Sequence, residues 1–236
     1  VLLHEHADES LLKQRFVEEA QIMGDLQHPG VVPIFEAGEL GDGRPFFAMK
    51  LVEGDSLTDL LDRRSSPQYD LPQFLRTLER VCQTIAFAHT RGVIHRDLKP
   101  LNVMVGVYGE VLVMDWGLSK RLANPREHDD SASDQPLPRA DGLTMPPMTT
   151  PQTQAESDDS GDKTRTGSVL GTPSYLSPEQ ARGHSESCDE RVDVFGLGAI
   201  LCEILTGKPP YWDADPRSVL AQAIAANLGP ARERLA

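Results

Sequence analysis

The chain has 236 residues, 39% of them hydrophobic, which is enough to bury a substantial core in one large domain or two lobes. Its formal net charge is −13, from 23 basic and 36 acidic residues, which argues against nonspecific nucleic-acid binding or an anionic membrane surface as its main partner. Three scattered cysteines and the lack of any apolar run of about eighteen residues predict a reducing, cytoplasmic setting without a membrane span in this chain, any anchor lying outside it.

The N-terminal part is predicted to hold one helix and one β-hairpin. Apolar residues recur at helical spacing over Asp8–Leu26, and His28-Pro29-Gly30 ends that helix. Two strands, Val31–Leu40 and Pro45–Val52, are then expected on either side of the turn Gly41-Asp42-Gly43.

The middle of the chain is predicted to hold two helices and a second hairpin. A short helix is expected over Ser56–Asp62, after Gly54 breaks the strand pattern. A long helix should span Asp70–Arg91, with Asp70 as its N-cap. Strands Asn102–Gly106 and Val111–Met114 complete the second hairpin.

The composition changes sharply over residues 123–163. This stretch is rich in Pro, Ser, Thr and Asp and poor in large apolar residues, so it cannot bury enough surface to offset chain entropy and is predicted to be a disordered insert. Beyond it, Val194–Leu205 is apolar almost all round, which predicts a helix buried at the centre of a domain. A further helix is expected over Pro216–Leu228.

The most informative motif is His95-Arg96-Asp97-Leu98-Lys99-Pro100-Leu101-Asn102, followed by Asp115-Trp116-Gly117. An aspartate beside an incoming hydroxyl can orient it and accept its proton, while an asparagine and a second aspartate hold Mg²⁺ on a phosphate chain. Taken alone, each of these residues is more often a loop cap or a turn residue. Their combination at this spacing indicates phosphoryl transfer.

These motifs stand in the order seen in Hanks-type Ser/Thr protein kinases, and the chain resembles bacterial members of that family over nearly its whole length apart from the insert. The resemblance implies a bilobal α+β fold with a partial N-lobe over 1–49, a hinge over 50–53 and a mainly helical C-lobe over 54–236. It also implies transfer of the γ-phosphate of ATP to Ser or Thr hydroxyls of protein substrates in signal transduction, with Mg²⁺ or, alternatively, Mn²⁺ as the metal.

The resemblance assigns roles at the phosphate end of the site. Asp97 matches the catalytic base, and Lys99 matches the lysine that steadies the transferring phosphoryl group. Asn102 and Asp115 match the Mg²⁺ ligands. Glu19 matches the helix glutamate that pairs with a strand lysine in active kinases, and its neighbour Glu18 is the rival for that role.

The resemblance also assigns the nucleotide-base end of the site. Met49 would be the gatekeeper behind the adenine, and backbone groups of Lys50 and Val52 would bond the edge of the base. Met104 and Leu57 would pack on its lower face, although ordinary core packing explains these two residues equally well.

A regulatory site is implied as well. An arginine at the position of Arg96 reads a phosphate on the activation segment in the family, and Lys120 would add a second positive charge. Thr166, and after it Thr164, are the predicted phosphate acceptors, modified in trans between two kinase copies.

Three further residues match structural positions of the family. Glu179, in Ser177-Pro178-Glu179, matches the A-P-E glutamate that a distant C-terminal arginine ties down. Asp193 matches the aspartate that holds the backbone of the catalytic loop, and Thr172 matches a threonine that contacts Asp97 and Lys99.

Two features depart from the family pattern. The glycine-rich loop and the lysine of V-A-I-K are absent, and so are the last helices of the large lobe. We therefore expect a chain truncated at both ends, inactive by itself, from a parent protein that is an active kinase. Trp116 replaces the phenylalanine of D-F-G and should fill the same apolar slot.

Two other functions stay open at this point. A pseudokinase scaffold that binds partners is favoured by the missing lysine only if the chain is naturally complete. It is opposed by the retained Asp97, Lys99, Asn102 and Asp115. A small-molecule phosphotransferase on a related fold is opposed by Gly171-Thr172-Pro173-Ser174-Tyr175 and Ser177-Pro178-Glu179, which resemble a groove for a polypeptide acceptor.

Overall fold

The structure is a computed structural model that describes residues 10–122, 172–184 and 187–236. These residues belong to one of two units, Val1–Arg126 joined by Ser168–Ala236. The predicted insert at 123–163 lies outside the described residues. Helices and strands both build the described unit, so the predicted α+β class is confirmed. Among the described residues, no helix combines the length and the apolar character needed to cross a membrane.

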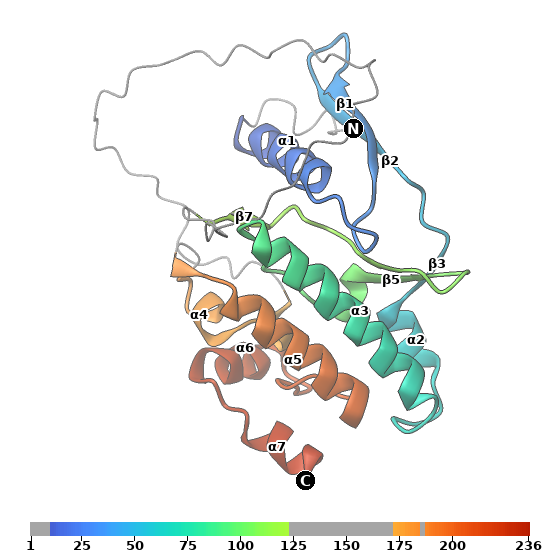
Figure 1. Cartoon of the computed structure of the whole chain (residues 1–236). Coiled ribbons are helices and arrows are strands. Elements are labelled where there is room, and N and C mark those ends of the chain that lie inside the picture. The colour runs from blue at the N-terminus through green and yellow to red at the C-terminus, as the bar shows by residue number, and fades with distance from the viewer. Residues whose placement is uncertain (1–9, 123–171, 185–186) are drawn as a thin grey trace, which may run out of the picture. The chain divides into compact units, whose positions relative to one another are not determined.

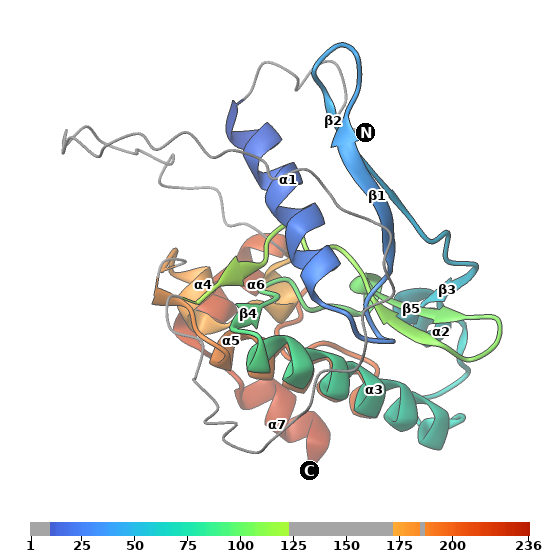
Figure 2. The ribbon, with the colours of Figure 1, turned by 45° about the horizontal axis from the view of Figure 1, so that its top comes forward.

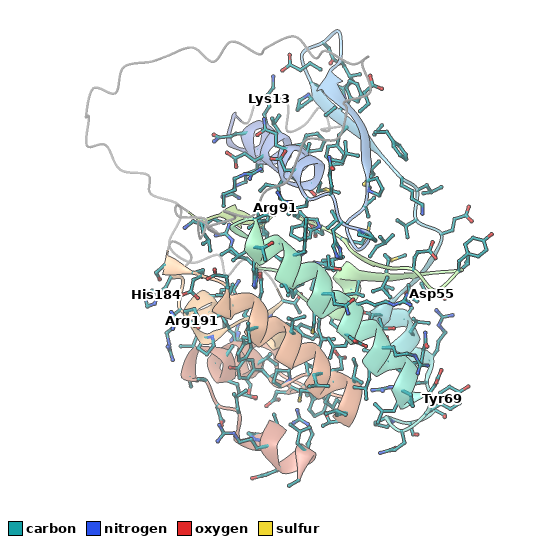
Figure 3. The ribbon with its side chains drawn as sticks, viewed as in Figure 1. Lys13, Asp55, Tyr69, Arg91, His184 and Arg191 are labelled. Carbon is teal, nitrogen blue, oxygen red and sulfur yellow. The ribbon has the colours of Figure 1, made fainter. Side chains whose placement is uncertain are left out.

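The N-terminal elements are a helix and an antiparallel hairpin, as predicted (Figure 1). They are α1 (Ser10–Asp25), β1 (Ile34–Glu39) and β2 (Pro45–Met49). The rings of Phe16 on α1 and Phe47 on β2 pack with their centroids 4.8 Å apart. Lys13 Nζ donates to the carbonyl oxygen of Gly43 at 2.8 Å, which ties α1 to the hairpin turn (Figure 3).

A three-stranded sheet and a pair of very short strands bring distant segments together. The sheet has the order β3-β5-β6, formed by β3 (Gly54–Ser56), β5 (Val103–Gly106) and β6 (Val111–Val113). The short pair is β4 (Val93–Ile94) with β7 (Lys120–Arg121), in antiparallel register. Because β4 precedes the His95–Asn102 motif and β7 follows Asp115, this pairing places the two motifs side by side.

Helix α2 (Leu57–Arg63) begins at a capping box. Ser56 Oγ accepts the backbone N–H of Asp59 at 3.1 Å, and the Asp59 carboxylate accepts the N–H of Ser56 at 3.2 Å. Helix α3 (Leu71–Thr90) starts one residue after the predicted N-cap. Asp70 thus stands at the N-cap position, as predicted, but its φ of 49° is left-handed and its side chain makes no cap hydrogen bond.

The C-terminal elements gather around α5 (Arg191–Thr206), beside which α3 lies in both ribbon views (Figures 1 and 2). The other helices are α4 (Pro178–Ala181), α6 (Pro216–Ala225) and α7 (Gly229–Leu235). Burial of α5 all round was predicted, and this is wrong for one side. Val194 is 60% exposed, because the elements described here pack on the sides that carry Asp193 and Ile200.

The main apolar core lies where α3, α5 and the strands β5 and β6 meet. Ile85 of α3, Ile200 of α5 and Val103 of β5 are each at most 1% exposed. Trp116 joins the same core and is fully buried. The two chemical motifs therefore stand on the best-packed part of the fold, which limits how far their side chains can move.

Candidate active site

The loop between β4 and η2 (Pro100–Asn102) brings three predicted catalytic side chains into contact. Lys99 Nζ donates to Asp97 Oδ2 at 2.6 Å. Asn102 Nδ2 donates to the same oxygen at 3.0 Å and to the Asp97 carbonyl at 2.9 Å. Asp97 is only 7% exposed. The Lys99 cation and the Asn102 amide hold its carboxylate in a defined direction.

The oxygen donors of Asn102 and Asp115 are of the kinds that fit a magnesium ion. Because both hydrogen bonds to Asp97 use the amide nitrogen of Asn102, the amide oxygen is left as a ligand. Asp115 is exposed, and its backbone φ of 59° is unusual for a non-glycine residue. The two are linked through the Met114 N–H, which donates to the Asn102 carbonyl at 2.8 Å. One carboxylate and one amide oxygen suit Mg²⁺, which takes its remaining ligands from phosphate and water.

His95 contacts residues of both motifs. It is fully buried, and its ring lies 4.7 Å from that of Trp116 in an edge-to-face arrangement. The N–H of Asp97 donates to His95 Nδ1 at 3.3 Å, and His95 Nε2 faces the Met114 carbonyl at 3.0 Å. These contacts require a neutral ring with its proton on Nε2. Trp116 Nε1 in turn donates to the Val113 carbonyl at 3.2 Å, so the indole is both packed and satisfied.

Asp193, in the first turn of α5, holds the backbone of the catalytic loop. Its two carboxylate oxygens accept the N–H groups of His95 and Arg96, each at 2.8 Å. His89 Nε2 on α3 lies 2.7 Å from the same carboxylate. Asp193 is 1% exposed, so this carboxylate is fully buried among donors.

Glu19 lies over Gly117, next to the predicted metal ligand Asp115. A Cβ atom placed on Gly117 would be 3.3 Å from Glu19 Oε2 and 3.4 Å from Asp115 Oδ1. Burial, and then the negative charge of Asp115, raise the pKa of the Glu19 carboxyl above its ordinary value. Two carboxylates that both approach Gly117 favour a cation near them.

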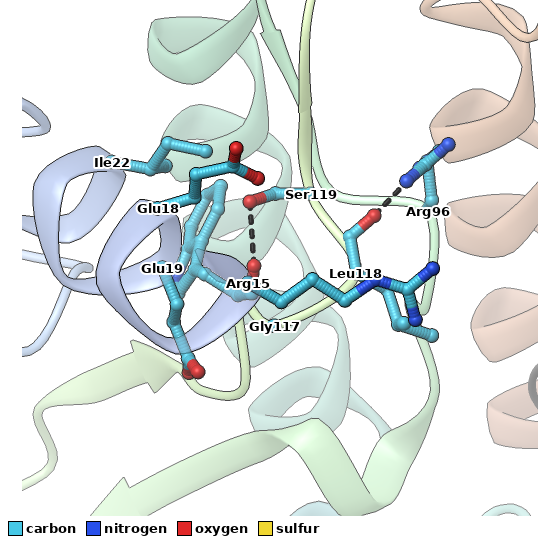
Figure 4. A pocket seen from close by; sticks show the side chains of 9 residues that line it. Arg15, Glu18, Glu19, Ile22, Arg96, Gly117, Leu118 and Ser119 are labelled. Carbon is cyan, nitrogen blue, oxygen red and sulfur yellow. Dashed lines mark hydrogen bonds between the residues drawn. The ribbon is translucent and has the colours of Figure 1, made fainter. Parts of the chain in front are cut away.

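A small cavity of about 90 Å³ lies beside Glu19 (Figure 4). Arg15 extends from α1 along its wall toward Leu118. Arg96 also lines the cavity and donates through Nε to the Leu118 carbonyl at 2.6 Å. Arg96 was predicted to be a phosphate-reading residue. Arg15 was missed, although its position four residues before Glu19 puts both on one helix face, which the sequence alone could have suggested.

Only some of the predicted regulatory residues lie in the described part of the chain. Lys120 lies in β7 and pairs with Ile94 of β4, one residue before the catalytic loop. Thr164 and Thr166 lie outside the described residues.

The predicted adenine contacts lie at the end of β2 and near the three-stranded sheet. Met49 is 44% exposed, and the Lys50 N–H donates to the Pro33 carbonyl at 3.0 Å, so only the carbonyl group of Lys50 is left for a base. Val52 and Met104 are partly buried against the main core. Leu57 is fully buried at the start of α2.

The predicted acceptor side includes Thr172 and Glu179. Thr172 is exposed, and in the described part of the chain its side chain bonds neither Asp97 nor Lys99, which pair with each other instead. Glu179 lies in the first turn of α4, and its carbonyl accepts the His184 N–H at 3.0 Å. Within the described residues, the charge of Glu179 acts on Arg191, the first residue of α5.

Comparisons with known proteins identify the family of the chain. The Protein kinase domain family matches residues 2–136 and 153–231. The serine/threonine-protein kinase PknD of Chlamydia caviae is 36% identical over 217 residues, which are 87% of this chain and 21% of that protein. The serine/threonine-protein kinase PknB of Mycobacterium leprae is 34% identical over 225 residues, 93% of this chain and 30% of that protein. The chain thus spans less than a third of the length of these relatives. It belongs to the protein kinase domain family and is homologous to bacterial serine/threonine-protein kinases.

Proposed function

We propose that the protein transfers the γ-phosphate of ATP to Ser or Thr hydroxyls of protein substrates, with Asp97, Lys99, Asn102 and Asp115 as its catalytic residues. The observation that carries the proposal is the Asp97 carboxylate, which receives hydrogen bonds from both Lys99 and Asn102. It is supported by the link from Asn102 to the residue before Asp115.

Each of these side chains has a distinct task. The hydroxyl oxygen of the acceptor forms a bond to the γ-phosphorus, the bond to the bridging oxygen breaks, and ADP leaves with the electron pair. Asp97 orients the hydroxyl and accepts its proton. Lys99, held at 2.6 Å from Asp97, supplies positive charge next to the transferred group. Mg²⁺ bound at Asn102 and Asp115 would neutralise charge on the phosphates.

The nucleotide base would bind beside the chain segment 50–53, which we propose as the hinge between an N-lobe over 1–49 and a C-lobe over 54–236. The carbonyl of Lys50 and the backbone of Val52 would bond the edge of adenine, because the N–H of Lys50 already serves Pro33. Met49 would lie behind the base and Met104 beneath it.

We also propose regulation by phosphorylation at Thr166, and after it Thr164, in trans between two copies of the protein. Arg15 and Arg96 line the same small cavity, and Lys120 lies in β7. A phosphothreonine carries nearly two negative charges and would draw these cations together. Since Arg15 is on the helix of Glu19, the same contact would orient that helix. Mass mapping that finds both threonines unmodified in a fully active protein would refute this regulation.

The deciding experiment measures phosphate transfer from labelled ATP to a protein acceptor, with this chain and with the longest native form that contains it. Asp97→Asn is the test variant and Asn227→Asp, at an exposed position near the end of α6, is the matched surface control. We expect transfer by the native form and the control, and a loss of at least about 100-fold in Asp97→Asn. Equal labelling in the native form and Asp97→Asn would exclude the proposed role of Asp97.

One observation favours a second candidate, a kinase-fold module that binds partners without transferring phosphate. Glu19 and Asp115 both approach Gly117, and burial together with the charge of Asp115 raises the pKa of Glu19, so two acidic groups stand together at this point of the site. Tight binding of an interaction partner together with no transfer by the native form would favour this candidate.

A further inference from the structure

Arg96, the residue before Asp97, has a backbone conformation that its neighbours must maintain. Its φ of 68° lies in the left-handed region, which non-glycine residues keep only when their surroundings impose it. On its amino side, the N–H donates to Asp193 at 2.8 Å. On its carboxyl side, the carbonyl oxygen of Arg96 accepts a hydrogen bond from Nε2 of Gln180 at 2.6 Å. The direction of the next residue, Asp97, depends on both contacts.

Gln180 is held at both ends of its amide group. Its Oε1 accepts the N–H of Ser177 at 3.2 Å and the Ser177 hydroxyl at 3.0 Å, as part of the capping box of α4. Ser177 is fully buried, so this end of the amide does not exchange with solvent. With the oxygen committed to Ser177, the amide NH₂ group must face Arg96. The cap of α4 and the clamp on Arg96 are therefore made by one side chain.

We propose that Gln180 is a positioning residue for phosphoryl transfer, which clamps the Arg96 carbonyl and thereby aligns Asp97 with the acceptor hydroxyl. It touches no reacting atom and acts through Arg96. The inference rests on the proposed function, because the role of Asp97 in transfer gives the clamp its catalytic consequence. It also means that the segment Ser177–Ala181 must be folded on the catalytic loop before Asp97 is correctly placed.

Two substitutions separate the clamp from the cap. Gln180→Glu keeps an oxygen for Ser177 but replaces the donor to Arg96 by a carboxylate oxygen, which repels the carbonyl. Gln180→Ala removes both contacts. Gln73→Glu, at an exposed position of α3, is the control for the same chemical change. The native form is assayed for kcat and for the KM of ATP and of the protein acceptor, and for hydrogen exchange at the Arg96 and Asp97 amides.

We expect kcat to fall about 10- to 100-fold in both Gln180 variants with the KM of ATP little changed, because a displaced catalytic group slows the chemical step more than binding. Gln73→Glu should keep the native kcat. A native kcat in Gln180→Glu would overturn the proposal, even if Gln180→Ala were impaired, because the cap alone would then explain the loss.

Hydrogen exchange separates failure of this inference from failure of the proposed function. If the native form transfers no phosphate, the proposed function fails, and the clamp is then judged by exchange alone. Faster exchange at Arg96 and Asp97 in Gln180→Glu than in Gln73→Glu supports the clamp. Equal exchange rates in the two variants overturn it.

Discussion

Glu19 of α1 and Asp115 both approach Gly117: a Cβ atom placed on that glycine would lie 3.3 Å from Glu19 Oε2 and 3.4 Å from Asp115 Oδ1. Burial, followed by the charge of Asp115, raises the pKa of Glu19. The N-terminal helix thus reaches the proposed metal site through a charged group as well as through Ile22 and Met23, which pack in the same core as Trp116. The approach of the two carboxylates is favourable only when a proton or another cation offsets the two charges.

Glu19→Gln should therefore stabilise the protein near neutral pH in the absence of nucleotide. Because the folded pKa of Glu19 is raised, its contribution to stability is fully present below the unfolded pKa and is lost as pH rises through the folded pKa. The variant should gain roughly 2–4 °C in Tm near pH 7.5 and nothing near pH 4. Circular dichroism at both pH values measures this. Glu18→Gln, at the exposed neighbouring position, should show no gain, and an equal gain there would contradict the assignment.

Gly196 allows α5 to approach the catalytic loop, and its substitution should impair the protein. A Cβ atom at this position would lie 2.8 Å from the Cβ of Leu98, the residue after Asp97. Gly196→Ala should lower the free energy of unfolding by about 1–3 kcal/mol and reduce kcat, since Leu98 must move. Urea denaturation and the transfer assay measure the two effects.

The matched control is Gly198→Ala on the same helix, where no atom lies within 4 Å of the added Cβ. There the substitution should raise the free energy of unfolding by about 0.5–1 kcal/mol, because alanine favours a helix over glycine. Equal effects at the two positions would show that helix propensity, and not the contact with Leu98, decides the outcome.

Asp193→Ala should be strongly destabilising, by about 3 kcal/mol or more in urea denaturation. It leaves the N–H groups of His95 and Arg96 without their buried acceptor, and it removes the partner of His89. Asp193→Asn should lose less stability than Asp193→Ala, because its amide oxygen still accepts one of these N–H groups. A full loss in Asp193→Asn would mean that the charge, and not the number of acceptors, holds the loop.

Trp116→Phe should reduce stability but keep phosphate transfer. The smaller ring leaves unfilled volume in the core and leaves the Val113 carbonyl without its indole donor, a cost of about 1–3 kcal/mol. The chain has two tryptophans, and the other, Trp212, is 49% exposed. Fluorescence of the variant should therefore shift to the red. Loss of transfer in a folded variant would show that the indole itself is needed.

Much of the secondary structure was predictable because its signals are local. The helices found as α1, α3 and α5 carry apolar repeats over many residues, and the two hairpins have turn residues between short apolar runs. The strands β3, β4 and β7 were missed. They have two or three residues each, and they exist only because a distant segment supplies their partner.

The sequence by itself determined which chemical groups are present and in what order: the aspartates, the lysine and the asparagine of two motifs, on a kinase-like arrangement of helices and strands. Only the tertiary structure decided which of them meet. It placed Asn102 on Asp97, Asp193 and Gln180 on the backbone of Arg96, and Arg15 beside the same loop. Among the described residues, Asp97 is bonded by Lys99 and Asn102. Such contacts depend on how separate elements pack. Hydrogen bonds form only at donor–acceptor distances of about 3 Å, and a local sequence pattern does not predict the distance between residues of separate elements.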